Sequence, residues 1–150
     1  MCTKNRPRGA WHEQHPKTRP TQSCVDDFIL QQADLARRAD CPTLVALMPD
    51  PTGEHAVMWG PSIVGFGRYR SPGGPWPVVA FSPRKNDMTV YLMPGFDQQA
   101  TLMQRLGKYK TGQVCLYLKR LADVDAAMLR QLGGGSVAAM APQRIFPGGT

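Results

Sequence analysis

The 150-residue sequence lacks any apolar run near the roughly 20 residues that a membrane-spanning helix needs, so we expect no membrane partner. Its N-terminus is basic but has no apolar signal segment, which predicts a cytoplasmic location. Charged residues are scarce, at 19%, whereas the 15 Gly and 14 Pro predict many turns and few long helices. The length suits one domain whose core needs neither disulfides nor metals.

Recognisable catalytic and metal-binding patterns are also missing. The four cysteines form no Cys-x-x-Cys pair and no zinc spacing with the histidines, so we predict no metal site and no cofactor. His55 is the only histidine in a segment expected to be ordered, and no Ser-His-Asp or Cys-His arrangement follows from the spacing. These absences favour a non-catalytic protein, and an enzyme of unknown reaction is the third of three functional alternatives.

The middle of the sequence does contain three β-like segments, Ile63–Tyr69, Val78–Ser82 and Met88–Leu92. Glycine and proline separate them, and the polar stretch Pro83–Asp87 suits a hairpin turn. In the third segment, Met88, Val90 and Leu92 fall on one face, and Thr89, Tyr91 and Met93 fall on the other. This alternation predicts an antiparallel sheet with one covered face and one face that is at least partly wet.

Helices are predicted around this sheet from capping residues and from apolar residues at helical spacing. The expected helices are Ser23 to about Arg38, Thr43–Met48 after Pro42, Asp97 to about Leu106, and one from Asp123 that Gly133–Gly135 ends. His55–Trp59 and Val114–Lys119 are two further expected strands. Together the elements predict an α+β fold, in which helices from the N- and C-terminal parts pack on an antiparallel sheet of about four to six strands.

The predicted domain covers residues 23–140. Residues 1–22 are polar and basic without hydrophobic periodicity, which predicts a disordered arm, and residues 141–150 are expected to form a flexible tail. No internal repeat is visible.

Charge is unevenly distributed. Residues 23–56 carry six acidic and two basic residues, whereas residues 57–120 carry nine basic and two acidic residues. This pattern is explained by solubility and internal complementarity, or alternatively by a surface for an anion such as a phosphate, a nucleotide or nucleic acid.

Two loops contain the basic pairs of interest: Arg84 and Lys85 in the hairpin turn, and Lys108 and Lys110 before Thr111. The second loop is not a P-loop, because it precedes a strand and its last glycine is not followed by lysine. If both loops lie at one end of the sheet, four cations converge on an anion site; otherwise these are solvated turn residues.

Aromatic residues concentrate on the predicted strands, where core packing and cross-strand pairing are the favoured explanation. The alternative is a pocket beside the bend at Gly60, Pro61 and Ser62, where small residues allow close approach. Its candidate residues are Trp59, Ser62, Tyr69, Trp76 and Tyr91.

Four stretches of the sequence resemble the YdhG-like family, a domain of unknown function: Thr52–Tyr69, Trp76–Phe96, Leu106–Asp125 and Ser136–Met140. Arg37–Met48 matches more loosely. The resemblance implies a small α+β fold with an antiparallel sheet. Two departures are a shortened loop at Ser71–Pro75 and the Gly133–Gly135 stretch, where the family's last helix normally continues.

A related branch of that family is similar to a frataxin-type iron chaperone, which would use surface carboxylates. Oxygen ligands suit iron and similar hard cations. The resemblance implies five candidates here: Asp26, Asp27, Asp34, Asp40 and Glu54. An iron carrier is therefore the second functional alternative. The first is a small non-catalytic binding module whose basic loops bind an anionic ligand, with nucleic acid as a weaker candidate partner.

Overall fold

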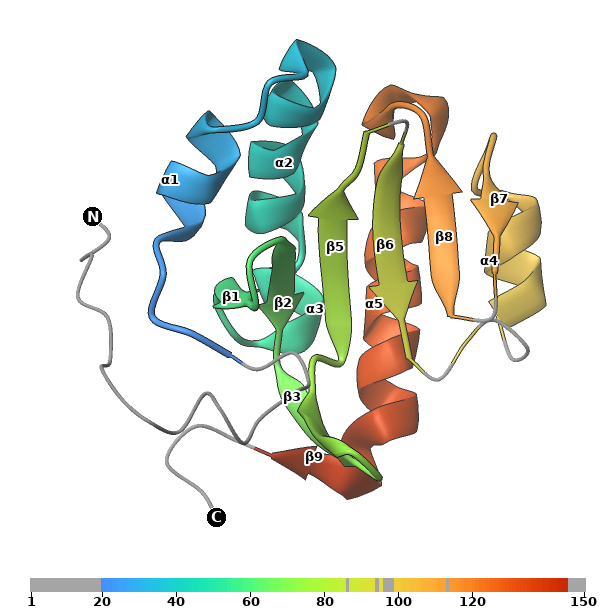
Figure 1. Cartoon of the computed structure of the whole chain (residues 1–150). Coiled ribbons are helices and arrows are strands. Elements are labelled where there is room, and N and C mark those ends of the chain that lie inside the picture. The colour runs from blue at the N-terminus through green and yellow to red at the C-terminus, as the bar shows by residue number, and fades with distance from the viewer. Residues whose placement is uncertain (1–19, 86, 94, 96–98, 113, 146–150) are drawn as a thin grey trace.

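The computed structural model describes residues 20–85, 87–93, 95, 99–112 and 114–145. Its main feature is a six-stranded antiparallel sheet with the strand order β1-β2-β5-β6-β8-β7. The strands are β1 (Val57–Trp59), β2 (Ile63–Phe66), β5 (Val79–Pro83), β6 (Met88–Leu92), β7 (Lys110–Thr111) and β8 (Cys115–Leu118). Helices lie behind this sheet in Figure 1, which confirms the predicted α+β class.

A second, three-stranded sheet has the order β4-β3-β9, from β3 (Arg68–Ser71), β4 (Gly74–Trp76) and β9 (Arg144–Ile145). We expected one strand from Ile63 to Tyr69, but Gly67 divides it into β2 and β3. Gly67 has a φ of 68°, a left-handed conformation that glycine adopts without the penalty of a side chain. The shortened loop forms the turn between β3 and β4.

The helices are α1 (Val25–Leu30), α2 (Leu35–Leu47), α3 (Pro49–Thr52), α4 (Ala100–Gln104) and α5 (Ala126–Met140), with short 3₁₀ turns η3 (Leu121–Asp123) and η4 (Ala141–Gln143). Within the described part of the chain, none of them combines the length and the apolar character needed to cross a membrane. Helices α2 and α5 pack on the sheet (Figure 1).

The predicted break at Pro42 and the predicted continuity from Ser23 to Arg38 are both wrong. The chain breaks earlier, at Asp34, whose carboxylate accepts hydrogen bonds from the backbone N–H groups of Ala36 and Arg37. From there α2 runs through Pro42, because its buried side chains keep helical spacing on both sides of the proline: Arg37, Asp40, Cys41 and Leu44. Packing of this face outweighs the missing N–H of Pro42.

The expected stop at Gly133–Gly135 is also wrong, since all three glycines lie inside α5. A methyl group on Gly133 would lie 3.2 Å from the sulfur of Met48. One on Gly135 would overlap the side-chain amide of Gln99, whose Nε2 donates a hydrogen bond to the Leu132 carbonyl at 3.2 Å. Contacts with neighbouring segments thus favour glycine at positions 133 and 135, where a larger residue would have to displace the Met48 or Gln99 side chain, and they offset the poor helix propensity of these glycines.

Both ends of the ordered fold extend beyond the predicted boundaries of 23 and 140. The backbone N–H of Thr21 donates to the Met58 carbonyl at 2.7 Å, which attaches the chain to β1. At the other end β9 pairs with β3, and Arg144 forms an ion pair with Glu54 at 2.7 Å. These pairings order segments that have too few apolar residues to be recognised from sequence. The rest of the expected arm (residues 1–19) and tail (146–150) lies outside the described residues.

The core lies between the inner face of the six-stranded sheet and the helices. One cross-strand row shows it: Val64, Phe81, Val90 and Leu116 are aligned across four strands and are at most 1% exposed. The alternate residues point to the outer face, where Thr89 aligns with Tyr117 and then with Lys110. The alternation predicted for Met88–Leu92 therefore separates the covered inner face from the outer face, on which Lys110 lies.

We expect Gly134→Ala and Gly135→Ala to have opposite effects on stability. A methyl group on Gly134 would lie 4.0 Å from Pro51, so alanine should raise the free energy of unfolding by about 0.5–1 kcal/mol through helix propensity. Gly135→Ala should lower it, because the methyl group displaces the Gln99 amide. Urea unfolding of both variants tests this, and equal stabilisation by the two would contradict the packing described for α5.

Candidate functional site

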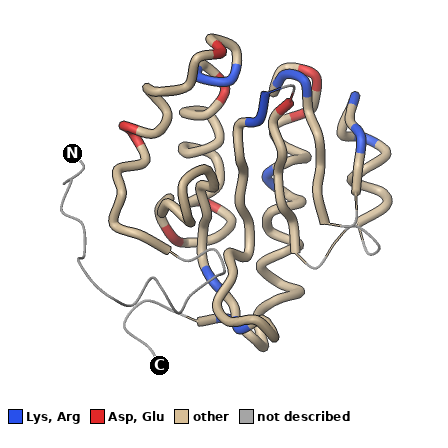
Figure 2. The backbone as a smooth tube through the Cα atoms, in the orientation of Figure 1, with Lys and Arg blue, Asp and Glu red and all other residues tan. Residues whose placement is uncertain are grey.

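The two basic loops lie at the same end of the six-stranded sheet. The turn from β5 to β6 precedes Met88, which is aligned with Leu118 at the end of β8. Strand β7 runs antiparallel to β8 and begins at that end, so Lys108 and Lys110 enter there as well. Figure 2 shows the blue Lys and Arg segments along this end, interrupted by red acidic positions. The arrangement required for convergence of the two loops is therefore present.

A pocket of about 270 Å³ opens at this end of the sheet. Its lining comes from the hairpin turn, the loop before β7, the end of β8 and η3. The lining residues are Asp87, Lys108, Tyr109, Lys110, Tyr117, Leu118, Lys119 and Asp123. Two of the four predicted cations, Lys108 and Lys110, thus line a common pocket, and Arg84 and Lys85 lie in the adjoining turn.

Backbone contacts with η3 hold the loop that carries the lysines. The N–H of Lys108 donates to the Asp123 carbonyl at 3.1 Å, and the N–H of Asp125 donates to the Leu106 carbonyl at 2.7 Å. Gly107, with a φ of 128°, makes this approach possible, because any Cβ there would collide with the Asp123 carbonyl. The position of Lys108 is therefore set by main-chain hydrogen bonds.

The lysines are available to a ligand. Among the described residues, the side chains of Lys85, Lys108 and Lys110 form no hydrogen bond or ion pair within the chain. Arg84 is partly engaged, since its Nη2 donates to the hydroxyl of Tyr91 at 2.9 Å. An unpartnered ammonium gains more from an incoming anion than one that must first leave an internal carboxylate.

Acidic groups share the site. The Asp87 carboxylate accepts from the Thr89 hydroxyl at 3.3 Å, and the Asp123 carboxylate accepts from the backbone N–H of Arg120 at the same distance. Neither bond uses the full acceptor capacity of a carboxylate. The pocket therefore offers hydrogen-bond acceptors as well as cations.

Thr111 does not belong to the pocket. It is aligned with Leu116 of the inner-face row, so it points away from the face that carries Lys110. Sequence reasoning also missed the other lining residues, which are Tyr109, Tyr117, Leu118, Lys119 and the two aspartates. The signal that links Tyr117 to Lys110 is their cross-strand alignment, and β7 is only two residues long, too short for periodicity to reveal it.

The five aromatic and polar residues proposed for a pocket near the Gly60 bend have structural partners. Trp59 and Trp76 make a T-shaped contact at 6.2 Å, and Trp59 is only 1% exposed. Tyr91 packs against a second, small cluster of Trp59, Ile63 and Ala80. Tyr69 packs against the main core, where burial raises its pKa. The Ser62 carbonyl accepts from the Ser82 hydroxyl at 2.6 Å. These contacts match the core-packing alternative.

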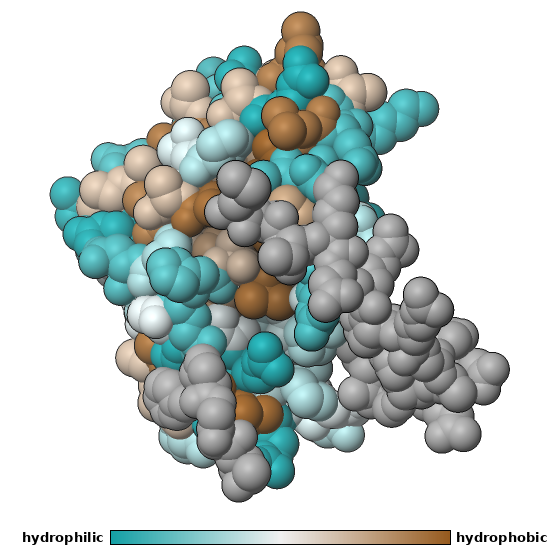
Figure 3. All heavy atoms as spheres, turned by 90° about the vertical axis from the view of Figure 1, so that its left-hand side faces the viewer, coloured by the Kyte–Doolittle hydropathy of each residue, from teal (hydrophilic) through white to brown (hydrophobic). Residues whose placement is uncertain are grey.

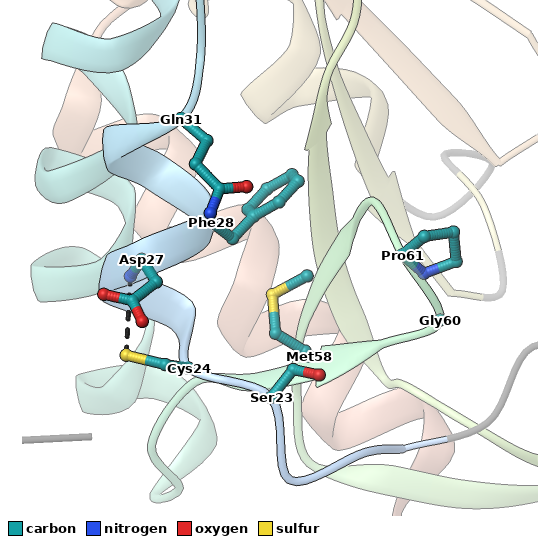
Figure 4. A pocket seen from close by; sticks show the side chains of 8 residues that line it. All are labelled: Ser23, Cys24, Asp27, Phe28, Gln31, Met58, Gly60 and Pro61. Carbon is teal, nitrogen blue, oxygen red and sulfur yellow. Dashed lines mark hydrogen bonds between the residues drawn. The ribbon is translucent and has the colours of Figure 1, made fainter. Parts of the chain in front are cut away.

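A pocket of about 240 Å³ does lie beside the Gly60 bend, but other side chains line it (Figure 4). They are Ser23, Cys24, Asp27, Phe28, Gln31 and Met58, together with Gly60 and Pro61. Figure 4 shows the Phe28 ring and Met58 on facing sides of this space. Among the described residues, its lining includes an acidic side chain and no basic one, which does not favour an anion.

Helices α1 and α2 border an apolar pocket of about 390 Å³, lined by Asp26, Ile29, Leu30, Pro42, Val45 and Ala46. Leu30 and Leu35 nearby are 66% and 68% exposed. Figure 3 faces this side of the molecule and shows hydrophobic atoms in small groups separated by hydrophilic ones. The surface is not a continuous apolar patch.

The five carboxylates of the iron-carrier alternative are dispersed. Asp34 caps α2, and its pKa is lowered mainly by the hydrogen bond from the backbone of Arg37. Asp40 accepts from Arg120 Nε at 3.0 Å, and Glu54 pairs with Arg144. Asp26 and Asp27 lie in the first turn of α1. Across the described residues, no three His, Cys, Asp or Glu side chains lie close enough together to hold a metal ion.

No protein-family model, curated protein or solved structure matches the chain. The resemblance to the YdhG-like family stays a prediction, and the function has to be argued from the geometry of the site.

In the described part of the chain, Cys41 and Cys115 are free cysteines, and they differ in environment. Cys41 is fully buried in α2, and burial raises the pKa of its thiol to about 12. Cys115 is partly exposed on β8, and its hydrogen bond with Tyr117 raises the pKa of that tyrosine.

We expect iodoacetamide to label Cys115 in the folded protein and to leave Cys41 unlabelled. At pH 8, a thiol with a pKa of about 12 is thiolate in only about one molecule in ten thousand, and reagent access is blocked as well. Peptide mass spectrometry after brief labelling measures this, with guanidinium-unfolded protein as the control in which both react. Equal labelling in the folded state would contradict the packing of α2 against the sheet.

Proposed function

We propose that this protein is a small, non-catalytic binding module that holds an anionic ligand in the pocket lined by Lys108 and Lys110. One observation carries the proposal: two lysines without internal partners line one pocket at the end of the sheet to which the Arg84–Lys85 turn also belongs. We further propose a cytoplasmic location and membership of the YdhG-like family, on the sequence patterns given above.

The energetics favour a polyvalent anion. One exposed ion pair contributes only about 0–1 kcal/mol, because water screens it and ordering long side chains costs entropy. Two ammonium groups in a shared, partly enclosed pocket act on the same ligand, and a phosphate group can accept hydrogen bonds from both. Lys85 and Arg84 in the next turn add to the positive potential that attracts the ligand.

The iron-carrier alternative has less support. Two of its five carboxylates, Asp40 and Glu54, are held by arginines, and Asp34 is occupied as a helix cap. Calorimetric titration with ferrous and ferric iron tests it directly, and tight binding would revive it. Because three of its five carboxylates are already engaged within the protein, we place the iron carrier second.

The double variant Lys108→Gln with Lys110→Gln should bind tripolyphosphate about tenfold more weakly than the native protein. Glutamine keeps much of each side-chain stem but removes both charges, and each lost contact with the anion costs up to about 1 kcal/mol at an exposed site. Isothermal titration calorimetry at low and moderate salt measures the loss.

A matched control is Arg38→Gln with Arg70→Gln, which removes two charges that do not line the pocket. It should change the affinity less than twofold. Equal weakening by both pairs would show that only the overall charge matters, and unchanged binding in the lysine variant would refute the site.

A further inference from the structure

We propose that the ligand of this pocket is a nucleotide: an aromatic base joined to phosphate, either free or within a single strand. This inference rests on the proposed function, since it names the chemistry of the anion that Lys108 and Lys110 hold. Three properties of the lining favour this ligand over a bare phosphate or another simple anion.

The first property is the pair of tyrosines. Tyr109 comes from the loop before β7 and Tyr117 from β8, and both are partly exposed in the pocket. Tyr117 is directly aligned with Lys110 across the β8–β7 pair, so both side chains leave the sheet on the same face and line the same pocket. A base that stacks on a tyrosine gains about 1–3 kcal/mol, whereas a simple phosphate gains nothing from the ring.

The second property is the presence of acids in a site for an anion. Asp87 and Asp123 line the same pocket as the lysines and would repel a bare phosphate. If the ligand also carries hydrogen-bond donors, these carboxylates accept hydrogen bonds from it, and this offsets their repulsion of its phosphate. Exocyclic amino groups of bases and hydroxyl groups of a sugar are such donors, and Asp side chains accept from them in nucleic-acid recognition.

The third property is the size. A pocket of about 270 Å³ lies slightly below the usual range for small-molecule sites, so it holds a single base with part of its sugar. The phosphate groups then remain near the mouth, where the lysine side chains and the Arg84–Lys85 turn provide positive charge. The division into a stacking part and a charged part matches the two halves of a nucleotide.

The outer face of the sheet offers a continuation for a second base. Tyr91 lies on the same face as Tyr117 and two positions along the neighbouring strand from Thr89, which is aligned with Tyr117. Its hydroxyl accepts a hydrogen bond from Arg84 at 2.9 Å, so a ring and a guanidinium lie next to each other there. A single-stranded nucleic acid could stack its second base on the Tyr91 ring, whereas a free nucleotide would have no base to place there.

The test compares ATP with tripolyphosphate, both without divalent ions, by isothermal titration calorimetry of the full chain. The two probes share a triphosphate chain, and tripolyphosphate carries one more negative charge than ATP, so tighter binding of ATP reports the base and the sugar. We expect ATP to bind about tenfold more tightly than tripolyphosphate, in line with one stacked base. Tyr117→Leu should abolish this difference and leave tripolyphosphate binding unchanged, because leucine keeps an apolar side chain but removes the ring.

Tyr91→Leu is the matched control on the same sheet face. Because it also removes the hydrogen-bond partner of Arg84, it should weaken binding of ATP by less than twofold, and it should weaken binding of a single-stranded hexanucleotide about fivefold if the natural ligand is a strand. A hexanucleotide that binds no tighter than ATP and is insensitive to Tyr91→Leu identifies the free nucleotide instead. If Tyr117→Leu fails to fold by circular dichroism, Tyr109→Leu provides the same comparison from the loop.

The outcomes separate this inference from the proposed function. Equal affinity for ATP and tripolyphosphate, with both weakened by the lysine substitutions, would overturn the nucleotide and leave the anion site standing. Absence of binding to either probe at millimolar concentration would overturn both.

Discussion

The arrangement of this protein's candidate site depends on the hydrogen bonds that the carboxylate of Asp40 accepts. Asp40 lies in α2, and the residue is 7% exposed. Its carboxylate accepts hydrogen bonds from the guanidinium of Arg120 and, at 2.9 Å, from the backbone N–H of Leu121. A buried charge of this kind is stable only when its partners are in place. The contact therefore fixes the start of η3 against α2. The Asp123 carbonyl at the end of η3 in turn holds the backbone of Lys108, so a helix in the N-terminal half of the chain positions a loop that lines the pocket.

Local patterns predicted the sheet better than the helices. The strand Met88–Leu92 was expected with the observed bounds, because alternation of buried and outward side chains is a property of the strand itself. Pro42 and Gly133–Gly135 misled the helix prediction, since their effect on an isolated helix is unfavourable and only contacts with other segments reverse it. Those contacts join α5 to Pro51 and Gln99, which lie far away in the sequence.

The candidate site was predictable in part. Two of its three lysines, Lys108 and Lys110, stand out in the sequence, but their convergence with the hairpin turn required the strand order, in which β6 lies between β5 and β8. The carboxylates and tyrosines that give the pocket its mixed chemistry come from four separate elements, and no local pattern connects them. The family resemblance and the iron-carrier alternative stay predictions, because the fold class is compatible with many functions.

The three glycines of α5 also bear on how the protein folds. Relative to alanines, they make the isolated helix less stable by about 2–3 kcal/mol, so this segment has little tendency to become helical before it meets its neighbours. We infer that α5 forms after the hairpin of β5 and β6, whose contacts are local in sequence and quickly made. In nascent chains, the part of the inner sheet face that α5 covers would then stay exposed until the last sixth of the chain docks, and this is the surface that a chaperone would shield.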